Sequence, residues 1–192
     1  MNAVLMSIQP KWCELIASGK KTLEVRKSRP KLETPFKVYI YCTKDKHGWF
    51  HFGKKERLDG KIIGEFVCDN IRRFDVPYPA YQSKLDKRIL EESCCSYYAL
   101  HRYAYHDDLY GWHISDLKIY DKPKDLVELY KPCISPDFQY CPNCPVGGEY
   151  ISEGEAEFLA IDGECSTEWY CNNRVTRPPQ SWCYVEELND GE

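Results

Sequence analysis

The chain has 192 residues, of which 43 % are hydrophobic, and it includes 15 tyrosines and 5 tryptophans. This length fits one domain of ordinary size with a small insertion, and the composition supplies an aromatic core. No apolar run approaches the roughly 20 residues that span a bilayer, and residues 1–8 are too short for a signal-peptide core, so we expect a soluble, cytoplasmic protein with no membrane partner.

The formal net charge is −4, but the charge is divided unevenly along the chain. Residues 1–73 carry a formal charge of +8, and residues 74–192 carry −12. Because binding follows the local potential, a basic first third is compatible with a nucleic-acid partner in spite of the acidic total. Alternatively, the two ends fold together and neutralise each other.

A strand and a short helix open the chain. Residues 4–8 form an apolar strand, and a helix is predicted from Pro10, because proline fits the first helical position. Trp12 and Leu15 have the spacing of one helix face, and Gly19 suits a left-handed cap at the end of the helix.

The next strand carries the pattern G-x-K-x-x-E-x-R. Side chains alternate along a strand, so Leu23 and Val25 would enter the core while Glu24 and Arg26 share the other face, with Lys21 at the mouth of the strand. Three ionic groups on one rigid edge can pair with one another, or hold a phosphate or the polar edge of a base. The alternative is a solvated face whose ion pairs contribute little to stability.

The middle of the chain predicts further strands and helices. Phe36–Cys42 is a strand rich in β-branched and aromatic residues. Residues 61–74 form a long strand, in which Gly64 indicates a bulge or bend. Residues 84–105 alternate helix-like segments, and another strand runs from 110 to about 120.

Residues 133–171 differ in composition from the rest, with five cysteines and eight acidic residues but no Lys or Arg. We therefore expect a single domain over residues 1–192, with a core of about 1–132 and 172–190 interrupted by this acidic, Cys-rich insertion. A last strand follows over 182–188.

The insertion contains a candidate structural zinc site. Cys141 and Cys144 are separated by two residues, a spacing at which two thiolates bind one Zn²⁺ from a tight turn. Cys165 and Cys171 would supply the second pair, with Cys133 as a substitute for either. Such a zinc would order an insertion with few apolar residues, and four thiolates would leave no open position for catalysis. Free thiols at an ordinary turn are the alternative.

Three further motifs accompany the G-x-K-x-x-E-x-R strand: SIQPKW at 7–12, GWHI at 111–114 and RPPQSW at 177–182. Together they resemble the ASCH domain family, a branch of the PUA-like β-barrels, over about residues 1–125 and 175–188. The closing motif resembles a subgroup from Gram-positive bacteria and their phages. The resemblance implies an α+β fold around a mixed β-barrel of five or six strands, with short flanking helices.

The resemblance also implies a cleft beside the barrel that accepts RNA or a nucleotide-like ligand. The motif strand and the later motifs would line it with Lys21, Glu24, Arg26, His113, Arg177, Gln180 and Ser181. RNA or nucleotide binding is therefore our first functional expectation. A protein-interaction adaptor, with 133–171 as the surface for a protein partner, is an alternative from another class.

A small hydrolase is the third functional hypothesis. A branch of the family hydrolyses the acetyl amide of N4-acetylcytidine, and Lys21 matches the lysine of that mechanism. The nucleophilic threonine falls on Glu24, which cannot replace a hydroxyl in the same manner, although Thr22 lies two residues away on the same strand face. The candidate catalytic residues are therefore Lys21, Thr22 and Glu24, and enzymatic activity stays open.

The predicted core combines apolar side chains from every strand with buried thiols. Trp112, Trp182 and the thiols of Cys13, Cys42, Cys68 and Cys183 belong to it, together with Leu5, Ile8, Trp12, Leu15, Leu23, Val25, Val38, Ile40, Ile63, Phe66, Ile114 and Val185. The first and last strands should share a sheet.

Overall fold

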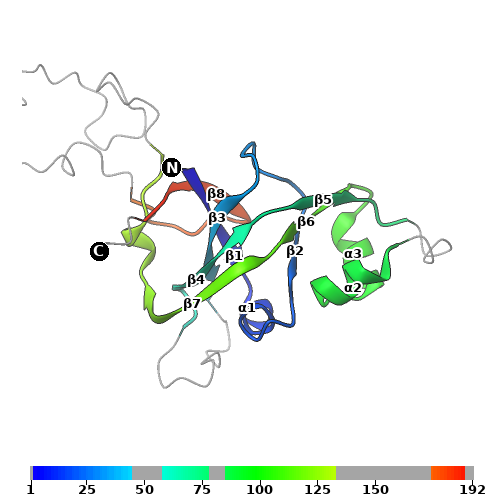
Figure 1. Cartoon of the computed structure of the whole chain (residues 1–192), viewed down its shortest axis with the longest axis horizontal. Helices are drawn as coiled ribbons and strands as arrows, with labels where there is room; N and C mark the ends of the chain where they lie inside the picture. Colours follow the sequence, from blue (N-terminus) through cyan, green and yellow to red (C-terminus); the bar gives the residue numbers. More distant parts are fainter. Residues whose placement is uncertain (1, 45–57, 78–84, 133–173, 189–192) are drawn as a thin grey trace, which may run out of the picture.

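The computed structural model describes residues 2–44, 58–77, 85–132 and 174–188. Within these ranges, eight strands form two sheets, and three α-helices and a short 3-10 helix accompany them (Figure 1). The predicted α+β class is therefore confirmed. None of the described helices has the length and apolar character needed to cross a membrane.

The larger sheet has five strands in the order β7-β4-β3-β1-β8. Its strands are β1 (Asn2–Ile8), β3 (Phe36–Cys42), β4 (Ile62–Cys68), β7 (Ser115–Lys124) and β8 (Trp182–Glu186). β1 runs parallel to β3 and antiparallel to β8, while the other neighbours are antiparallel. The first and last strands thus share a sheet, as predicted.

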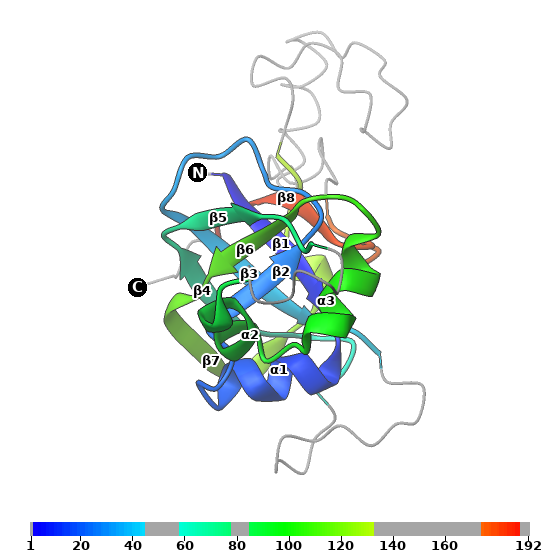
Figure 2. The same cartoon turned by 90° about the vertical axis from the view of Figure 1, so that its right-hand side faces the viewer.

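The smaller sheet has three antiparallel strands in the order β2-β6-β5. They are β2 (Leu23–Arg26), β5 (Ile71–Phe74) and β6 (Leu109–His113). The helices are α1 (Pro10–Ala17), α2 (Lys87–Ser93), α3 (Tyr97–Ala104) and the 3-10 helix η2 (Leu126–Glu128). Figure 2 shows α2 and α3 beside the smaller sheet.

Two long strands that we predicted as continuous are each divided between the sheets. Asp69 and Asn70 separate β4 from β5, and Ile114 separates β6 from β7. At both places the chain passes from one sheet to the other. For this reason the described residues contain eight strands in two sheets, where we expected five or six strands in one barrel.

Gly64 lies at an irregularity of the larger sheet, as its position predicted. The pairing of β4 with β7 shifts register between Ile62 and Gly64. A Cβ atom on Gly64 would lie 2.4 Å from the carbonyl oxygen of Lys118. Only glycine lets β7 approach so closely, because a Cβ atom at this position would overlap the backbone of β7.

The apolar residues form three clusters that bury both faces of the larger sheet and the helix side of the smaller one. One includes Met6, Ile40 and Phe66 with α1, and a second includes Leu5, Tyr39 and Val185 on the opposite face. The third joins β2 and β6 to α2 and α3 and includes Leu23, Val25, Ile89, Tyr97, Leu100, Ala104 and Leu109.

Most of the predicted core is buried, but four side chains, Cys183 among them, are only partly so. Trp12 and Leu15 are intermediate because Cys13 and Ile16 occupy the core side of α1. Trp182 is also partly buried, and its indole N–H reaches the edge of the fold, where it donates to Ser28 Oγ at 3.1 Å. By contrast, Trp112 is fully buried, as predicted.

Three of the four predicted buried thiols, Cys13, Cys42 and Cys68, are buried, while Cys183 is half-buried. Burial raises the pKa of the Cys68 thiol to about 12 and raises that of Cys183. These thiols therefore behave as small apolar groups.

Candidate functional site

Strand β2 is buried on both of its faces. Leu23 and Val25 belong to the cluster under α2 and α3. On the other face, Lys21, Glu24 and Arg26 are 2 %, 6 % and 8 % exposed. The alternative of a solvated face is therefore wrong, and we call these three residues the ionic trio.

Glu24 bridges the two cations of the ionic trio. Its Oε2 lies 3.3 Å from Lys21 Nζ, and its Oε1 lies 3.1 Å from Arg26 Nη2. This is the arrangement that the spacing of the motif led us to expect. Because desolvated charges are costly, the carboxylate between them is what allows two cations to be buried side by side.

Lys21 is held from several sides. Its ammonium group donates to the carbonyl oxygens of Leu23 at 2.9 Å and Ser93 at 2.7 Å, in addition to its ion pair with Glu24. The Trp12 ring lies 5.0 Å from Nζ. Two of the three ammonium hydrogens are therefore donated to carbonyl oxygens, while Glu24 Oε2 lies at ion-pair distance without a hydrogen bond.

Arg26 is less completely satisfied. Its Nη2 donates to the carbonyl oxygen of Ser7 at 2.7 Å and so joins β2 to β1. Its Nε is buried without a hydrogen-bond partner. A buried donor without a partner typically costs about 1–3 kcal/mol, so this position calls for an explanation beyond stability.

The ionic trio lines a cavity of about 1020 Å³. Among the described residues that line it, Lys11, Lys21, Arg26, Lys44 and Arg102 are basic, and Glu24 alone is acidic. Aromatic and apolar side chains complete much of the lining: Ile8, Trp12, Val25, Tyr41, Leu100, Tyr103, Leu126, Pro178 and Pro179. The size and the mixture of apolar walls with a few polar groups are those of a small-molecule site.

The closing motif reaches the cavity through Ser7. The Ser7 hydroxyl donates to the carbonyl oxygen of Pro179 at 2.7 Å, and the Ser7 N–H donates to that of Ser181 at 2.9 Å. Gln180 and Ser181 line the cavity, as does Pro178. Arg177 is exposed and is not among the lining residues, so the closing segment contributes an amide and a hydroxyl there instead of a guanidinium.

Two other candidates lie away from the cavity lining. His113 Nδ1 is 2.6 Å from Asp69 Oδ1, and this contact lowers the pKa of the Asp69 carboxyl. Thr22 is tied through its backbone, with its N–H donating to Glu92 and its carbonyl accepting from Ile114. Both residues therefore support the smaller sheet instead of joining the ionic trio.

Several lining residues could not be identified from the sequence. Trp12 lines the cavity although its spacing predicts a core position, and Cys95, Arg102 and Tyr103 line it from a region that the sequence predicts only as helical. The repeated Tyr and Arg of α3 are an available signal, since aromatic and basic residues on one helix often mark a binding surface.

All the predicted zinc ligands, Cys141, Cys144, Cys165, Cys171 and the substitute Cys133, lie outside the described residues. Within residues 2–44, 58–77, 85–132 and 174–188, no group of three or more His, Cys, Asp or Glu side chains is placed to hold a metal ion.

A family model for the ASCH domain matches residues 6–124. The chain belongs to the ASCH domain family. This is a PUA-like family associated with RNA binding. The match includes the last three residues of β1 and all three strands of the smaller sheet, the motif strand β2 among them. A comparison with curated proteins finds no match.

The ASCH fold is also found in three similar crystal structures of ASCH from Zymomonas mobilis, two of them of mutant proteins. All are 16 % identical to this chain, and each covers 96 % of it. The TM-scores are 0.54 and 0.55 for the mutants, with 91 % and 89 % of those chains covered, and 0.51 for the third, with 88 % covered. At this identity the likeness concerns the fold.

Proposed function

We propose that this ASCH domain binds RNA by taking a nucleotide into the cavity beside β2. The observation that carries the proposal is the buried ionic trio lining a cavity of about 1020 Å³, in which a buried Arg26 donor has no partner. Pairs of opposite charge that serve stability alone are normally fully satisfied. A charged group left incompletely hydrogen-bonded beside a cavity is the kind of group around which functional sites are built.

The distribution of charge fits a nucleotide better than a neutral metabolite. Lys11, Lys44 and Arg102 are exposed and line the cavity, so they are available to phosphate oxygens. Trp12 and Tyr103 offer aromatic faces of the kind on which bases stack. Gln180 carries an amide that can donate to and accept from the polar edge of a base.

The contacts of Lys21 favour binding over hydrolysis. A lysine that acts as a base or nucleophile needs a free lone pair directed at its substrate, but Lys21 Nζ donates to two carbonyl oxygens and forms an ion pair with Glu24. Thr22, the remaining hydroxyl of the motif strand, is not among the lining residues. We therefore place the hydrolase, for example one acting on an N4-acylated cytidine, second to the binding function.

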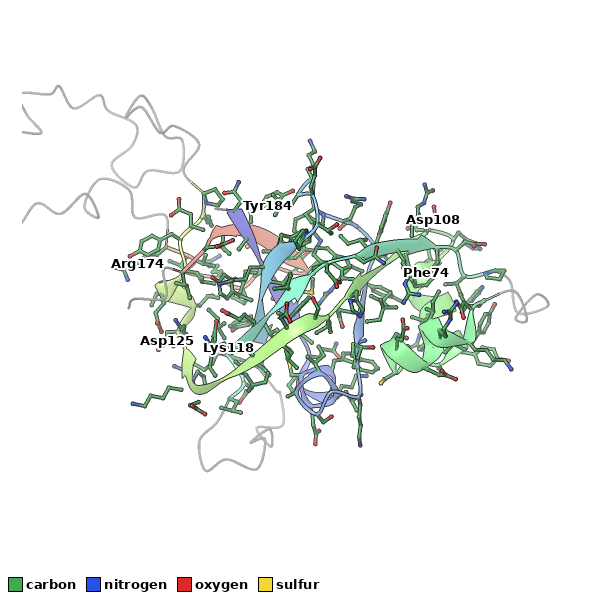
Figure 3. The ribbon with its side chains drawn as sticks, viewed as in Figure 1. Phe74, Asp108, Lys118, Asp125, Arg174 and Tyr184 are labelled. Carbon is green, nitrogen blue, oxygen red and sulfur yellow. The ribbon has the colours of Figure 1, made fainter. Side chains whose placement is uncertain are left out.

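Titration with labelled single-stranded RNA at several salt concentrations tests the proposal. Arg102→Ala should weaken binding and reduce the dependence of log K on log salt by about one, because one phosphate contact is lost. Lys118→Ala is the matched control, because Lys118 is exposed on β7, away from α2 and α3 (Figure 3). Equal effects of the two substitutions, or no RNA binding at low salt, would contradict the proposal.

The likeness of the RPPQSW motif supports a place in the subgroup from Gram-positive bacteria and phages, and the two-sheet arrangement is compatible with a PUA-like barrel.

For the predicted zinc site in residues 133–171, metal analysis of the protein should find about one zinc per chain, and Cys141→Ser should remove most of it. Zinc-free protein in which this segment resists protease would contradict the zinc site. A protein partner lost on its deletion would support the adaptor reading.

A further inference from the structure

Exposed tyrosines gather on α3 and its end. Tyr98, Tyr103 and Tyr105 are 66 %, 41 % and 77 % exposed. Among the described residues, the only other large hydrophobic side chain with comparable exposure is Val127, at 44 %. Single exposed apolar residues are ordinary, but three aromatic rings within eight residues make a surface with a specific character.

The exposed tyrosines are not needed for the packing of α3. The helix contributes Tyr97, Leu100 and Ala104 to the cluster under the smaller sheet. Tyr98 and Arg102 follow on another side at a spacing of four residues, and Tyr105 comes three residues later. Residues four apart lie on one helix face, so Tyr98 and Arg102 share an exposed side of α3, and Tyr105 is exposed at the left-handed cap that ends the helix; we call these three residues the exposed stripe.

This stripe is continuous with the cavity. Four residues of α3 line the cavity, namely Ala99, Leu100, Arg102 and Tyr103. Arg102 therefore belongs both to the lining and to the exposed stripe. A ligand that leaves the cavity past Arg102 meets Tyr98 and Tyr105 next.

The end of α3 presents an aromatic residue in a costly conformation. Tyr105 and His106 have φ angles of 47° and 73°, in the left-handed region where Gly or Asn is favoured at a helix end. Their rings lie 5.5 Å apart. The chain therefore holds an exposed aromatic pair where a small residue would be easier to accommodate.

We propose that Tyr98, Arg102 and Tyr105 form a stacking track for single-stranded RNA that extends from the cavity. This inference rests on the proposed function and deepens it. Bases farther along the strand than the nucleotide in the cavity stack on the tyrosine rings, and Arg102 contacts a phosphate on the path between the cavity and these bases. Lys27, whose ammonium lies 5.5 Å from the Tyr103 ring, provides a second cation beside the track, although Asp107 partly neutralises it at 3.9 Å.

The length of the track sets the length of the RNA. Tyr98 and Tyr105 are seven residues apart, which is about 10 Å along a helix. This distance exceeds the roughly 3.4 Å between stacked neighbouring bases, so the two rings serve bases that are not adjacent. With the nucleotide in the cavity, the ligand is a segment of about four nucleotides or more. A duplex does not fit, because its base faces are covered by their neighbours.

The test compares labelled single-stranded RNAs of two and eight nucleotides, both of mixed sequence, by fluorescence anisotropy. The native protein should bind the octamer at least about tenfold more tightly than the dinucleotide. The double variant Tyr98→Leu/Tyr105→Leu should lose about tenfold or more for the octamer and leave the dinucleotide unchanged. Tyr98→Phe/Tyr105→Phe keeps both rings and should stay within about twofold of the native protein, as should Val127→Ala.

The outcomes separate this inference from the proposed function. If the dinucleotide binds and depends on Arg26, but the octamer binds no better, the track is refuted and the cavity stands. If neither RNA binds, the proposed function itself fails. A duplex of equal length that binds as tightly as the octamer also refutes the track. Crosslinking of an octamer containing 4-thiouridine gives a readout in the native protein: crosslinks within residues 97–106 support the track, and crosslinks confined to other peptides overturn it.

Discussion

Two groups of polar residues, one on each sheet, both contain a glutamate held by two partners, but their surroundings differ. In the ionic trio, a carboxylate lies between two cations. On the larger sheet, Glu65 lies between Lys37, at 3.7 Å, and the hydroxyl of Tyr120, which donates to it. We call these three residues the Glu65 group. Both groups place a largely buried glutamate inside a sheet.

The difference lies in what is left unsatisfied. In the Glu65 group, each carboxylate oxygen has its own partner, and none of the three residues lines the cavity. In the ionic trio, both oxygens of Glu24 also lie beside a cation, but Arg26 Nε has no hydrogen-bond partner, and all three residues line the cavity. A buried charge is therefore not a functional sign by itself, whereas a leftover donor beside a cavity is one.

The largest expected effect concerns stability. Glu24→Gln removes the only charge between two buried cations and should lower the free energy of unfolding by about 3 kcal/mol. Glu65→Gln keeps an acceptor for Tyr120 and leaves a partly exposed lysine, so it should cost about 1 kcal/mol. Denaturant titrations of the two variants under one set of conditions check the comparison. Equal losses would mean that the two groups have the same structural role.

The second expected effect concerns binding. Arg26→Ala should weaken RNA binding by about 1–3 kcal/mol, the usual cost of a lost guanidinium contact, and Arg26→Lys should restore little of it. Lys37→Ala is the control from the Glu65 group and should leave the Kd unchanged. Because Arg26 also joins β2 to β1 through Ser7, the Kd should be measured well below the melting temperature of each variant. If folded Arg26→Ala protein binds RNA with the native Kd, Arg26 has a structural role and does not contact the RNA.

A third effect is expected at Cys95, which lines the cavity. Burial raises the pKa of its thiol, so the reactive thiolate is scarce at pH 7, and alkylation should accelerate up to a higher pH than for a free thiol. Bound RNA should slow the reaction severalfold by covering the cavity. Peptide mass spectrometry separates Cys95 from the other cysteines, and the buried Cys68 serves as the unreactive control. Unchanged alkylation in the presence of saturating RNA would place the RNA elsewhere.

The smallest effect is expected for Asp69, whose pKa is lowered by its hydrogen bond with His113. A lowered folded-state pKa gives stability that is fully present above the unfolded value of about 3.9 and is lost as pH falls through the folded value. Because the pair is largely exposed, Asp69→Asn should cost only about 0.5 kcal/mol near pH 6 and nothing near pH 2. Thermal melts at the two pH values measure this. A loss as large as that of Glu24→Gln would remove the contrast between buried and exposed pairs.

The order of the elements and the bridge at Glu24 could be predicted from local patterns. Alternation placed Leu23 and Val25 on one side of Glu24 and Arg26, and the proline and glycine around α1 marked its ends. The burial of both faces of β2 could not be predicted this way. It depends on α2 and α3, which come more than sixty residues later in the chain.

The wrong predictions for the face of α1 and for the two long strands have one physical cause. Trp12 and Cys13 are neighbours on α1, and a helix of eight residues has too few turns for its spacing to select one face over the next. Likewise, the residue types predict continuous strands across Asp69–Asn70 and across Ile114, although the chain passes from one sheet to the other at both places. Propensity reports local preference, whereas the change of sheet depends on the pairing of distant strands.

The position of β1 has a consequence for how the protein is made. This apolar strand is next to last in the larger sheet, between β3 and β8, and its second partner lies some 180 residues further along the chain. During synthesis, one edge of β1 therefore stays unpaired until β8 has left the ribosome. Open apolar edges are where nascent chains associate wrongly, so folding is expected to be slow and assisted by chaperones. Ser7 can complete the wall of the cavity only after β8 and the closing motif have been synthesised, because it binds the closing motif.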